Sequence, residues 1–566
     1  MLGEPVLCSF PSLRGIKNSF LAAGVSLALP GIFLPAQQAG YTVRGTVLDS
    51  TTRQPIARAL VQVANGDAVL TDSNGGFDFA NVPAQQATIM VRRPGYLTNQ
   101  TDAPGPQPSQ DQVSIYPVTI GSNTPPLTLS LMPEAVLTGH LSLLDSDAAD
   151  GIQVTAYRKG VENGRPKWTM AGMAATNSQG VFRIANLPAG SYLLYTQPSL
   201  DLFFAIANNS ASSGYPAVYF PGVTDASAAG VITLATGEHK QADITLLRQT
   251  FYPVTIKVAN APPGDFVNLD IQDSAGRAMQ QGAARYDAQQ QAAHASLPAG
   301  RYLLDARTFD VGTNRSSLFG HAEFTVSTAP VTYVSISVLP LRKIPVIIRR
   351  EFTAPTTATL GVIGLSQGPS PGLNLNLVAA DATFSGGNSA GGLQPLPGSN
   401  DGSAFQIESV PPGKYWVEAN AFDGYISSIS SGGVDLAHEV LTVGAGGASA
   451  PIEVTLRNDA GSIDGTIGAG QVPPGDTSHA WIYAIPLFAT TSDLPTASPD
   501  SSGKFRFDNL PPGSYRLVAC DSPRQIEFRT PEGLAAWAGR GQVVSVEAGG
   551  AAHVQLDVTA TAELGQ

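Results

Sequence analysis

Residues that could bind a metal or attack a substrate are scarce and scattered in this sequence. No HExxH, HxH or CxxC pattern occurs, and such spacings are what place several ligands around one zinc ion. The Gly-rich run at 385–392 is interpreted as a flexible loop, so neither a nucleophile elbow nor a phosphate-binding loop is predicted. We therefore expect no catalytic residue, no metal site and no cofactor, and the chain is predicted not to be an enzyme. The seven histidines stand singly, at His140, His239, His294, His321, His438, His479 and His553.

Aromatic rings are the remaining candidates for ligand contact, since sugar rings stack on exposed aromatic faces. Trp416 faces away from its neighbours Tyr415 and Val417 in an alternating pattern, which places it on the outer face of a strand. A second group of aromatic residues lies in the insertion at 199–224. This insertion is of interest because long loops tend to carry function. The alternative is that these rings pack inside the fold, as aromatic side chains usually do. Packing is the favoured interpretation, and Trp416, Trp168, Tyr215, Tyr219 and Phe220 are the candidates for glycan contact.

The first 39 residues have the order of features of a secretory signal peptide. Arg14 and Lys17 precede an uncharged apolar stretch at 19–35, and small residues follow it. The stretch contains Pro30 and is short for a membrane-spanning helix, although an uncleaved anchor is the alternative. The protein is therefore predicted to be extracytoplasmic, whether secreted, periplasmic or on the cell surface, with no transmembrane segment beyond the signal region.

The two cysteines, Cys8 and Cys520, give no disulfide framework. Removal of the signal peptide would take Cys8 with it and leave Cys520 unpaired. No histidine motif surrounds Cys520, so it is predicted to be structural and not a nucleophile.

One segment type recurs five times and is the strongest signal in the chain. Each copy begins with turn residues, mostly Asp or Asn with Gly, and most continue with two apolar residues in alternation before an apolar residue and a proline. In most copies a glycine and a tyrosine then open a returning strand. The repeat is therefore predicted to be a strand, a short Pro-Gly loop and a second strand. The anchoring prolines are Pro83, Pro188, Pro298, Pro411 and Pro511.

The spacing of the repeats predicts an all-β chain of about five tandem sandwiches. Successive prolines lie roughly 100–113 residues apart, which is the size of one small β-sandwich domain. Strands with clean alternation open and close each repeat and place the borders between domains. The predicted division is a signal peptide at 1–39 followed by Ig-like or prealbumin-like β-sandwiches at 40–133, 134–248 (with the aromatic insertion), 249–340, 341–457 and 458–566.

The first repeat resembles the carboxypeptidase regulatory-like domain family. The resemblance covers residues 41–97 and rests on GTVLDSTTRQPIARALVQV, on Phe77 and Phe79 after a glycine turn, on Val82-Pro83, and on RRPGY. The later repeats are similar to it, and to Cna-B-like and starch-binding-like sandwiches, mainly through segments such as LPPGSYRL. This resemblance implies a transthyretin-like sandwich with a non-catalytic accessory role, and it brings no set of functional residues.

Charge and organisation together favour a binding or structural role. The net charge is −12 and no basic run occurs, which argues against a nucleic acid partner. Five repeats behind an export signal favour a non-catalytic scaffold or adhesion-type interaction protein of a bacterial cell envelope. Its partner would be a cell-surface protein or a polysaccharide. The alternative, suggested by the starch-binding-like resemblance, is a carbohydrate-binding accessory protein.

Overall fold

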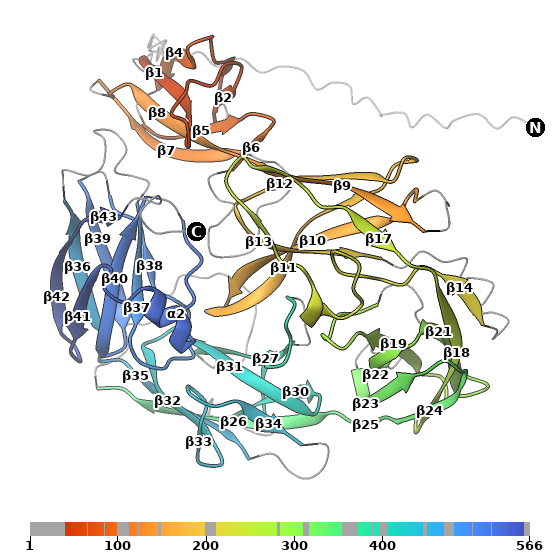
Figure 1. Ribbon diagram of the computed structural model, residues 1–566. Helices are drawn as coiled ribbons and strands as arrows, with labels where there is room; N and C mark the ends of the chain where they lie inside the picture. Colours follow the sequence, from red (N-terminus) through yellow and green to blue (C-terminus); the bar gives the residue numbers. More distant parts are fainter. Residues whose placement is uncertain are drawn as a thin grey trace, which may run out of the picture.

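The structure is a computed structural model, and it consists almost entirely of β-strands (Figure 1). The helical elements among the described residues are one six-residue α-helix and one 3-10 turn, so the all-β prediction is confirmed. The predicted signal peptide at 1–39 lies outside the described residues. The structure describes residues 40–64, 66–83, 85–98, 113–122, 124–144, 149–197, 211–279, 284–309, 316–353, 372–385, 389–396, 404–444, 450–468, 480–500, 502–521 and 523–559.

For description, unit 1 to unit 5 denote the five predicted spans that begin at residue 40; that each is a separate domain stays a prediction. Unit 1 contains β1 (Gly40–Asp49), β2 (Leu60–Val63), β3 (Ala68–Leu70), β4 (Gly76–Pro83), β5 (Gln85–Arg92), β6 (Tyr96–Leu97), β7 (Ser114–Ile120) and β8 (Leu127–Pro133). Unit 2 contains β9 (Ala135–Leu143), β10 (Gln153–Glu162), β11 (Arg165–Ala175), β12 (Val181–Leu187), β13 (Gly190–Thr196), β14 (Ser212–Gly214), η1 (Ala226–Ala228), β15 (Ile232–Leu234), β16 (His239–Gln241) and β17 (Ile244–Leu246).

The remaining three units are likewise built almost entirely from strands. Unit 3 contains β18 (Gln249–Ala259), β19 (Phe266–Gln272), β20 (Arg285–Asp287), β21 (Ala292–Pro298), β22 (Gly300–Phe309), β23 (Ser316–Val326), β24 (Val331–Ser337) and β25 (Leu339–Pro340). Unit 4 contains β26 (Arg342–Glu351), β27 (Leu373–Ala379), β28 (Ser389–Gly391), β29 (Leu393–Pro395), β30 (Ala404–Val410), β31 (Gly413–Ala421), β32 (Tyr425–Ser431), β33 (Val434–Asp435), β34 (Leu441–Val443) and β35 (Ile452–Arg457). Unit 5 contains β36 (Gly461–Ile467), β37 (Trp481–Pro486), β38 (Thr496–Ala497), β39 (Lys504–Leu510), β40 (Gly513–Cys520), α2 (Pro531–Ala536), β41 (Gln542–Val546), β42 (Ala551–Leu556) and β43 (Val558–Thr559).

All five units share one pattern of strand pairing. The opening strand (β1, β9, β18, β26 or β36) pairs antiparallel with the first strand of the repeat and parallel with a closing strand. The returning strand of the repeat (β5, β13, β22, β31 or β40) pairs in a different sheet. The Pro-Gly loop therefore carries the chain from one sheet to the other, and the two strands of a repeat do not pair with each other.

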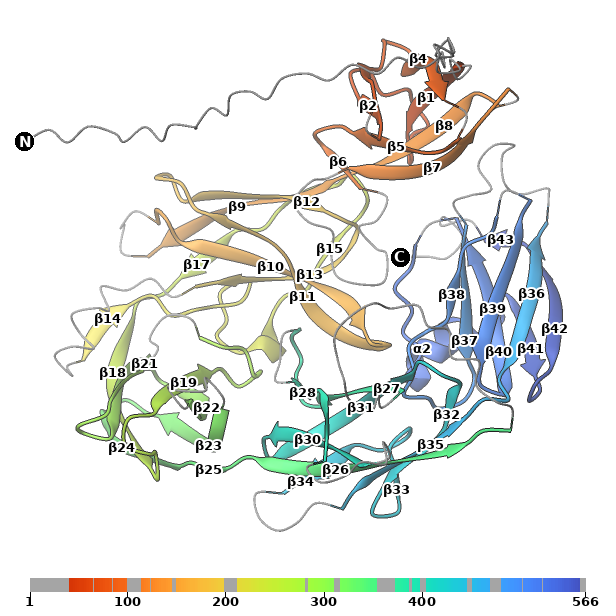
Figure 2. The same cartoon turned by 180° about the vertical axis from the view of Figure 1, so that it is seen from behind.

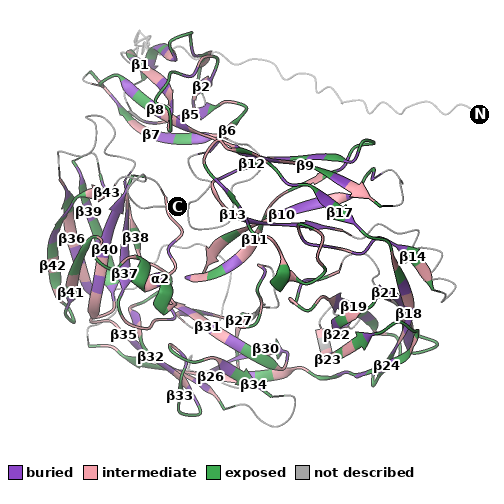
Figure 3. Cartoon of the chain, in the orientation of Figure 1, coloured by how far each residue is buried: buried purple, intermediate pink, exposed green. Residues whose placement is uncertain are grey.

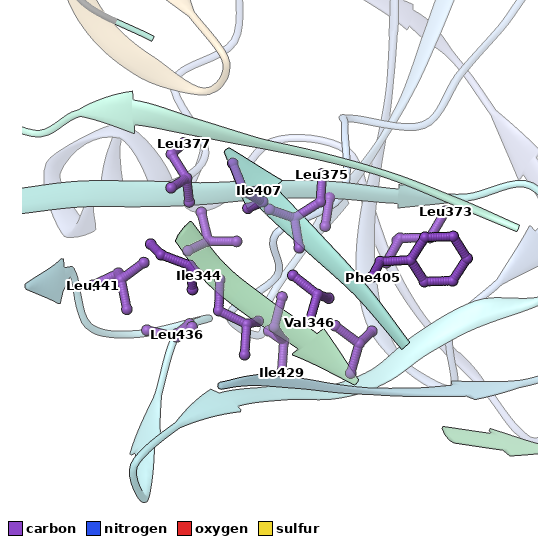
Figure 4. Packing of buried hydrophobic residues seen from close by; sticks show 14 of the residues in the cluster. Ile344, Val346, Leu373, Leu375, Leu377, Phe405, Ile407, Ile429, Leu436 and Leu441 are labelled. Carbon is purple, nitrogen blue, oxygen red and sulfur yellow. The ribbon is translucent and has the colours of Figure 1, made fainter. Parts of the chain in front are cut away.

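A hydrophobic core joins the two sheets of every unit. Five clusters of buried residues each draw on strands of both sheets of one unit, and buried positions alternate along these strands (Figure 3). In unit 4, Phe405 and Ile407 of β30 lie among aliphatic side chains from β26, β27 and β32 (Figure 4). Burying a side chain such as Phe405 stabilises the fold by about 1.5–3 kcal/mol. The apolar positions that the repeat predicted as inward are therefore the core.

The tyrosine of the repeat has a defined hydrogen bond in addition to its burial. The hydroxyl of Tyr515 donates to the carbonyl oxygen of Pro511 at 2.7 Å, four residues earlier. The same bond occurs in units 2, 3 and 4, from Tyr192, Tyr302 and Tyr415 to the carbonyls of Pro188, Pro298 and Pro411. The Pro-x-Gly-x-Tyr spacing thus satisfies a buried carbonyl and holds the crossing loop against the core.

Glycines in the opening strands make room for the phenylalanines of the repeat. Gly139 of β9 lies opposite Phe182 of β12, and a Cβ on Gly139 would stand 2.5 Å from the Phe182 ring. The Gly45–Phe77 and Gly465–Phe505 pairs repeat this arrangement in units 1 and 5. The aromatic ring covers the glycine across the strand pair, so the two residue types are required together.

We predict that the thiol of Cys520 is unreactive in the folded protein. Cys520 is fully buried, and burial raises the pKa of its thiol to about 11, so little thiolate forms at neutral pH. In a Cys8→Ser variant, a coloured thiol reagent should therefore react with the chain only after denaturation. Rapid labelling of the native Cys8→Ser variant at neutral pH would contradict this burial.

Candidate functional site

A long hairpin in unit 2 extends beyond its own sandwich. Asn163 and Gly164 connect β10 to β11 with φ angles of 52° and 74°, as a two-residue type I′ turn requires. The neighbouring strand β13 pairs with β10 over Val154–Arg158 alone. The distal half of the hairpin therefore projects from unit 2, and both views show it directed towards units 4 and 5 (Figures 1 and 2).

The tip of the hairpin contacts unit 5 through backbone hydrogen bonds. The carbonyl oxygen of Gly164 accepts from the amides of Phe528 at 3.2 Å and Arg529 at 3.0 Å. The amide of Val161 donates to Oε1 of Gln525 at 3.0 Å. A Cβ on Gly164 would lie 2.5 Å from the Phe528 ring, so only glycine allows this approach.

The base of the projecting half contacts unit 4. The amide of Trp168 donates to the carbonyl of Thr383 at 3.1 Å, and the amide of Ser385 donates to the carbonyl of Trp168 at 2.9 Å. The hydroxyl of Ser385 donates to Oε2 of Glu162 at 2.7 Å. The side chain of Phe384 is buried between them, 5.0 Å from the Tyr157 ring. This short parallel bridge joins two units that are not neighbours in the sequence.

Charged side chains fill the space between the hairpin, unit 4 and unit 5. The Arg165 guanidinium lies 3.4 Å from the centre of the Trp416 ring, and its Nη1 donates to the carbonyl of Arg529. The Arg529 side chain, 6% exposed, lies with Nη1 3.7 Å from Oε1 of Glu418. We call this set of contacts, from the hairpin residues 160–168 to units 4 and 5, the central junction.

Burial disfavours the charged forms of the groups in the central junction. It lowers the pKa of Arg165 to about 10, with the nearby Arg529 acting in the same direction. Burial also lowers the pKa of Arg529 and raises that of Glu418, although their mutual attraction opposes both shifts. The central junction therefore buries two guanidinium groups near the Glu418 carboxylate, and Nη2 of Arg529 also donates to the carbonyls of Thr491 and Ser492.

A second joint connects units 2 and 3. The Arg277 guanidinium lies 2.9 Å from the centre of the Tyr195 ring, and its Nε donates to the Tyr219 hydroxyl at 2.9 Å. Its Nη2 forms an ion pair with Asp273 at 3.1 Å, and the Tyr219 hydroxyl also donates to Asp273 at 3.0 Å. Strand β14, which lies in the span of unit 2, pairs with β18 of unit 3. Units 2 and 3 are thus joined by a shared sheet and a buried polar cluster.

The predicted glycan residues lie in these contacts or in a core. Tyr219 is buried beside Arg277, and Trp168 packs half-buried in the same apolar cluster as Phe384. Tyr215 is buried in the core of unit 2, and Phe220 packs against that core. Trp416 lies on the outer face of its strand, as predicted, but Arg165 covers its ring. The structure therefore brings Trp168 and Trp416 to the central junction, and glycan contact by the five residues stays a prediction.

Carboxylates and amides that open the repeats act as turn acceptors. Oδ1 of Asp72 accepts from the amides of Asn74 and Gly76, both at 2.8 Å, and Asp500 binds the amides of Ser502 and Lys504 in the same way. Within the described part of the chain, no three His, Cys, Asp or Glu side chains are grouped as metal ligands would be.

The Gly-rich run at 385–392 is partly ordered as a strand, which corrects its interpretation as a loop. Residues Ser389–Gly391 form β28, which pairs with β27 of unit 4. Backbone pairing outweighs the flexible composition here because β27 offers a free edge. Ser389 therefore lies within a strand and not at a strand-to-helix turn.

The hairpin was not predicted, although a signal for it exists in the sequence. Asn-Gly between two alternating segments is the strongest short-range hairpin signal, and Asn163-Gly164 supplies it. Arg277, Arg529 and Glu418 have no comparable signal. The rings that contact Arg277 and the partner of the Arg529–Glu418 pair lie in other units, so spacing along the chain does not reveal these contacts.

Comparison with known proteins supports the family assignment of unit 1. Residues 42–116 match the carboxypeptidase regulatory-like domain family, so the resemblance that the first repeat showed is confirmed for this part. No curated protein matches the chain.

No helix among the described residues has the length and apolar character needed to cross a membrane.

Similar solved structures include the TIE protein of Bacillus anthracis and two pilins. The TIE protein of Bacillus anthracis is 15% identical with a TM-score of 0.16, and the match covers 53% of this chain and 51% of that one. A streptococcal ancillary pilin is 12% identical with a TM-score of 0.20, covering 53% of this chain and 100% of the pilin. The minor pilin GBS52 of Streptococcus agalactiae is 14% identical with a TM-score of 0.20, covering 37% and 96%. This chain thus spans about half the length of the TIE protein, and TM-scores of this size carry no information about function.

Proposed function

We propose that this chain is a non-catalytic scaffold or adhesion-type interaction protein of a bacterial cell envelope, acting outside the cytoplasm. The observation that carries the proposal is the central junction. There, the polar and aromatic side chains that could have formed a ligand site instead join units 2, 4 and 5. Side-chain contacts between units hold the units of a chain together, as a scaffold requires. Its partner would be a protein or polysaccharide of a cell surface.

Expression with and without residues 1–39 in a bacterial host tests the location that this proposal requires. The full chain is expected outside the cytoplasm, where added protease can digest it in intact cells. The shortened chain should remain inside and be protected, because the apolar stretch at 19–35 directs export. Retention of the full chain in the cytoplasm would contradict the proposal, and so would turnover of polysaccharide, peptide or ester substrates by the purified protein.

A second candidate function, carbohydrate binding, is favoured by the composition of one sheet face. Cross-strand pairs of β27 and β31 place Asn374 beside Asn420 and Asn376 beside Glu418, on the same outer face as Trp416. Arg165 covers Trp416 and Asn420 is bonded to Asp493 of unit 5, so sugar binding would require these contacts to open. Amides, a carboxylate and an indole together suit a neutral sugar, which offers hydroxyl groups and an apolar ring face.

A glycan array compares the two candidate functions directly. If the face binds sugar, Trp416→Ala is expected to weaken binding at least tenfold. The control Phe422→Ala removes an aromatic ring that is 69% exposed in the same unit and should leave the affinity unchanged. The scaffold function without glycan recognition predicts no saturable binding by the wild-type chain.

A further inference from the structure

We propose that the tip of the β10–β11 hairpin, residues 160–165, is a releasable latch that fastens unit 2 to unit 5 and covers the ring of Trp416. This goes beyond the scaffold role, because it gives the chain a second, open state in which the tip is detached from unit 5 and the ring of Trp416 is exposed. The base of the hairpin, where Trp168 meets Phe384, stays attached to unit 4 and acts as the fixed end.

The first reason is the different chemistry of the tip and the base. The base is anchored by Phe384, which is buried among the rings of Tyr195, Tyr219 and neighbouring apolar side chains. The tip is held by three bonds from backbone amides, by the bond from the Ser385 hydroxyl to Glu162, by the charged groups, and by the contact of Gly164 with Phe528. Contacts with little buried apolar surface open at low free energy, so the tip is expected to separate first.

The second reason is that closure leaves buried polar groups poorly satisfied. Nε of Arg165 and Nε of Arg529 are both buried and have no hydrogen-bond partner among the described residues. The Arg529–Glu418 distance of 3.7 Å is longer than a hydrogen bond, so this pair recovers only part of the lost hydration. The pKa shifts of Arg165, Arg529 and Glu418 all disfavour the charged form, in agreement with this geometry. Nη2 of Arg529 donates to the carbonyls of Thr491 and Ser492 within unit 5, so Arg165 is the group that regains access to water when the tip leaves.

The third reason is that release requires no rearrangement inside unit 2. The hairpin beyond Arg158 has no pairing with β13, and its two strands remain paired with each other from Glu162↔Arg165 inwards. The hairpin therefore keeps its own hydrogen bonds when the tip separates from unit 5. Units 4 and 5 stay joined by the bonds between Asn420 and Asp493 and by the bond from the Ala419 amide to the Thr491 carbonyl. The hairpin tip is therefore the part that moves, and the face of Trp416 that Arg165 covers would be exposed.

Amide hydrogen exchange on the full chain tests the latch without any substitution. The amides of Phe528 and Arg529 donate to the hairpin tip, whereas those of Trp168 and Ser385 form the bonds at the base. After correction for intrinsic rates, we expect the tip amides to exchange at least tenfold faster than the base amides. Equal protection at both places would overturn the proposal, because tip and base would then open together.

A larger side chain at Gly160 provides a variant in which the contact between the tip and unit 5 is weakened. Gly160 lies in β10 with an ordinary strand conformation, and a Cβ there would stand 2.8 Å from Oε1 of Gln525. Gly160→Leu should displace Gln525 and accelerate exchange at Phe528 and Arg529 at least tenfold further, with the base amides changed less than twofold. The control Met170→Leu, on an exposed position of β11, should change neither.

A variant on the unit 5 side keeps the test valid if Gly160→Leu disturbs the hairpin itself. Gln525→Ala removes the acceptor of the Val161 amide and leaves β10 and β11 unaltered. It is expected to accelerate exchange at Phe528 and Arg529 at least threefold, with Trp168 and Ser385 unchanged. Unaltered exchange of the tip amides in both variants would overturn the latch.

Discussion

Replacing Arg277 by alanine is expected to destabilise the joint between units 2 and 3 by about 3 kcal/mol. Breaking a buried ion pair costs about 3–5 kcal/mol, because the remaining charge loses its partner in a poorly hydrated site. We expect the lower end of this range. Oδ1 of Asp273 keeps its bonds to two backbone amides, and its Oδ2 keeps the Tyr219 hydroxyl. The lost contact with the Tyr195 ring contributes in the same direction.

Urea unfolding followed by hydrogen exchange measures the effect of Arg277→Ala in the full chain. Amides of β14 and β18 should lose protection together, because these strands pair across the joint. The control Arg301→Ala removes an exposed arginine from the same unit and should change stability by less than about 0.5 kcal/mol. Similar results for Arg277→Ala and Arg301→Ala would show that the joint does not depend on the buried guanidinium.

Truncating Phe182 to alanine is expected to cost about 3–5 kcal/mol, the range for removing a buried aromatic ring from a core. Phe182 is 1% exposed and covers Gly139 on the opposite strand, so its removal leaves a void lined by a glycine that has no side chain to fill it. The neighbouring core residues Ile184 and Leu137 can collapse into such a void only by moving two paired strands.

Peptide-resolved hydrogen exchange separates this loss from changes elsewhere in the chain. Amides of β9 and β12 should become exchangeable at lower urea in Phe182→Ala, while those of unit 1 remain protected. Val181→Ala, at a 41% exposed position next to it, is the control and should change stability by less than about 0.5 kcal/mol. If Phe182→Ala and Val181→Ala unfold at the same urea concentration, the ring does not support the core as described.

The local form of each repeat follows closely from its residues. Alternation of Phe505 and Phe507 determines which face of β39 is buried, and the tyrosine four residues after a proline predicts a buried hydroxyl with an acceptor nearby. These features depend on residues within about twenty positions of one another, so spacing along the chain reveals them. The predicted inward positions are confirmed for this reason.

The bulge that precedes the proline in four of the five repeats shows how far a local pattern can be interpreted. Asn81, Asn186 and Asn509 have φ angles of about 60°, and each lies where the pairing with the opening strand shifts by a bulge. Asn accepts this conformation readily, so the bulge was predictable there. Ser409 adopts it as well, whereas the equivalent Ser296 lies in regular pairing. The same residue type gives two conformations because the opposing strand, and not the serine, sets the register.

The sequence by itself determined an all-β chain with repeated segments of strand, loop and strand, their inward faces and the family resemblance of the first unit. Those properties arise from periodicity and turn chemistry, which act over short distances. Only the tertiary structure showed that each Pro-Gly loop crosses between sheets, and that Arg165, Glu418 and Arg529 meet in one junction. These residues come from three units, and their approach depends on how whole sheets pack. Isolated charged residues at such separations carry no periodic signal, which is why the sequence placed Trp416 on the outer face of its strand but did not reveal the arginine that covers its ring.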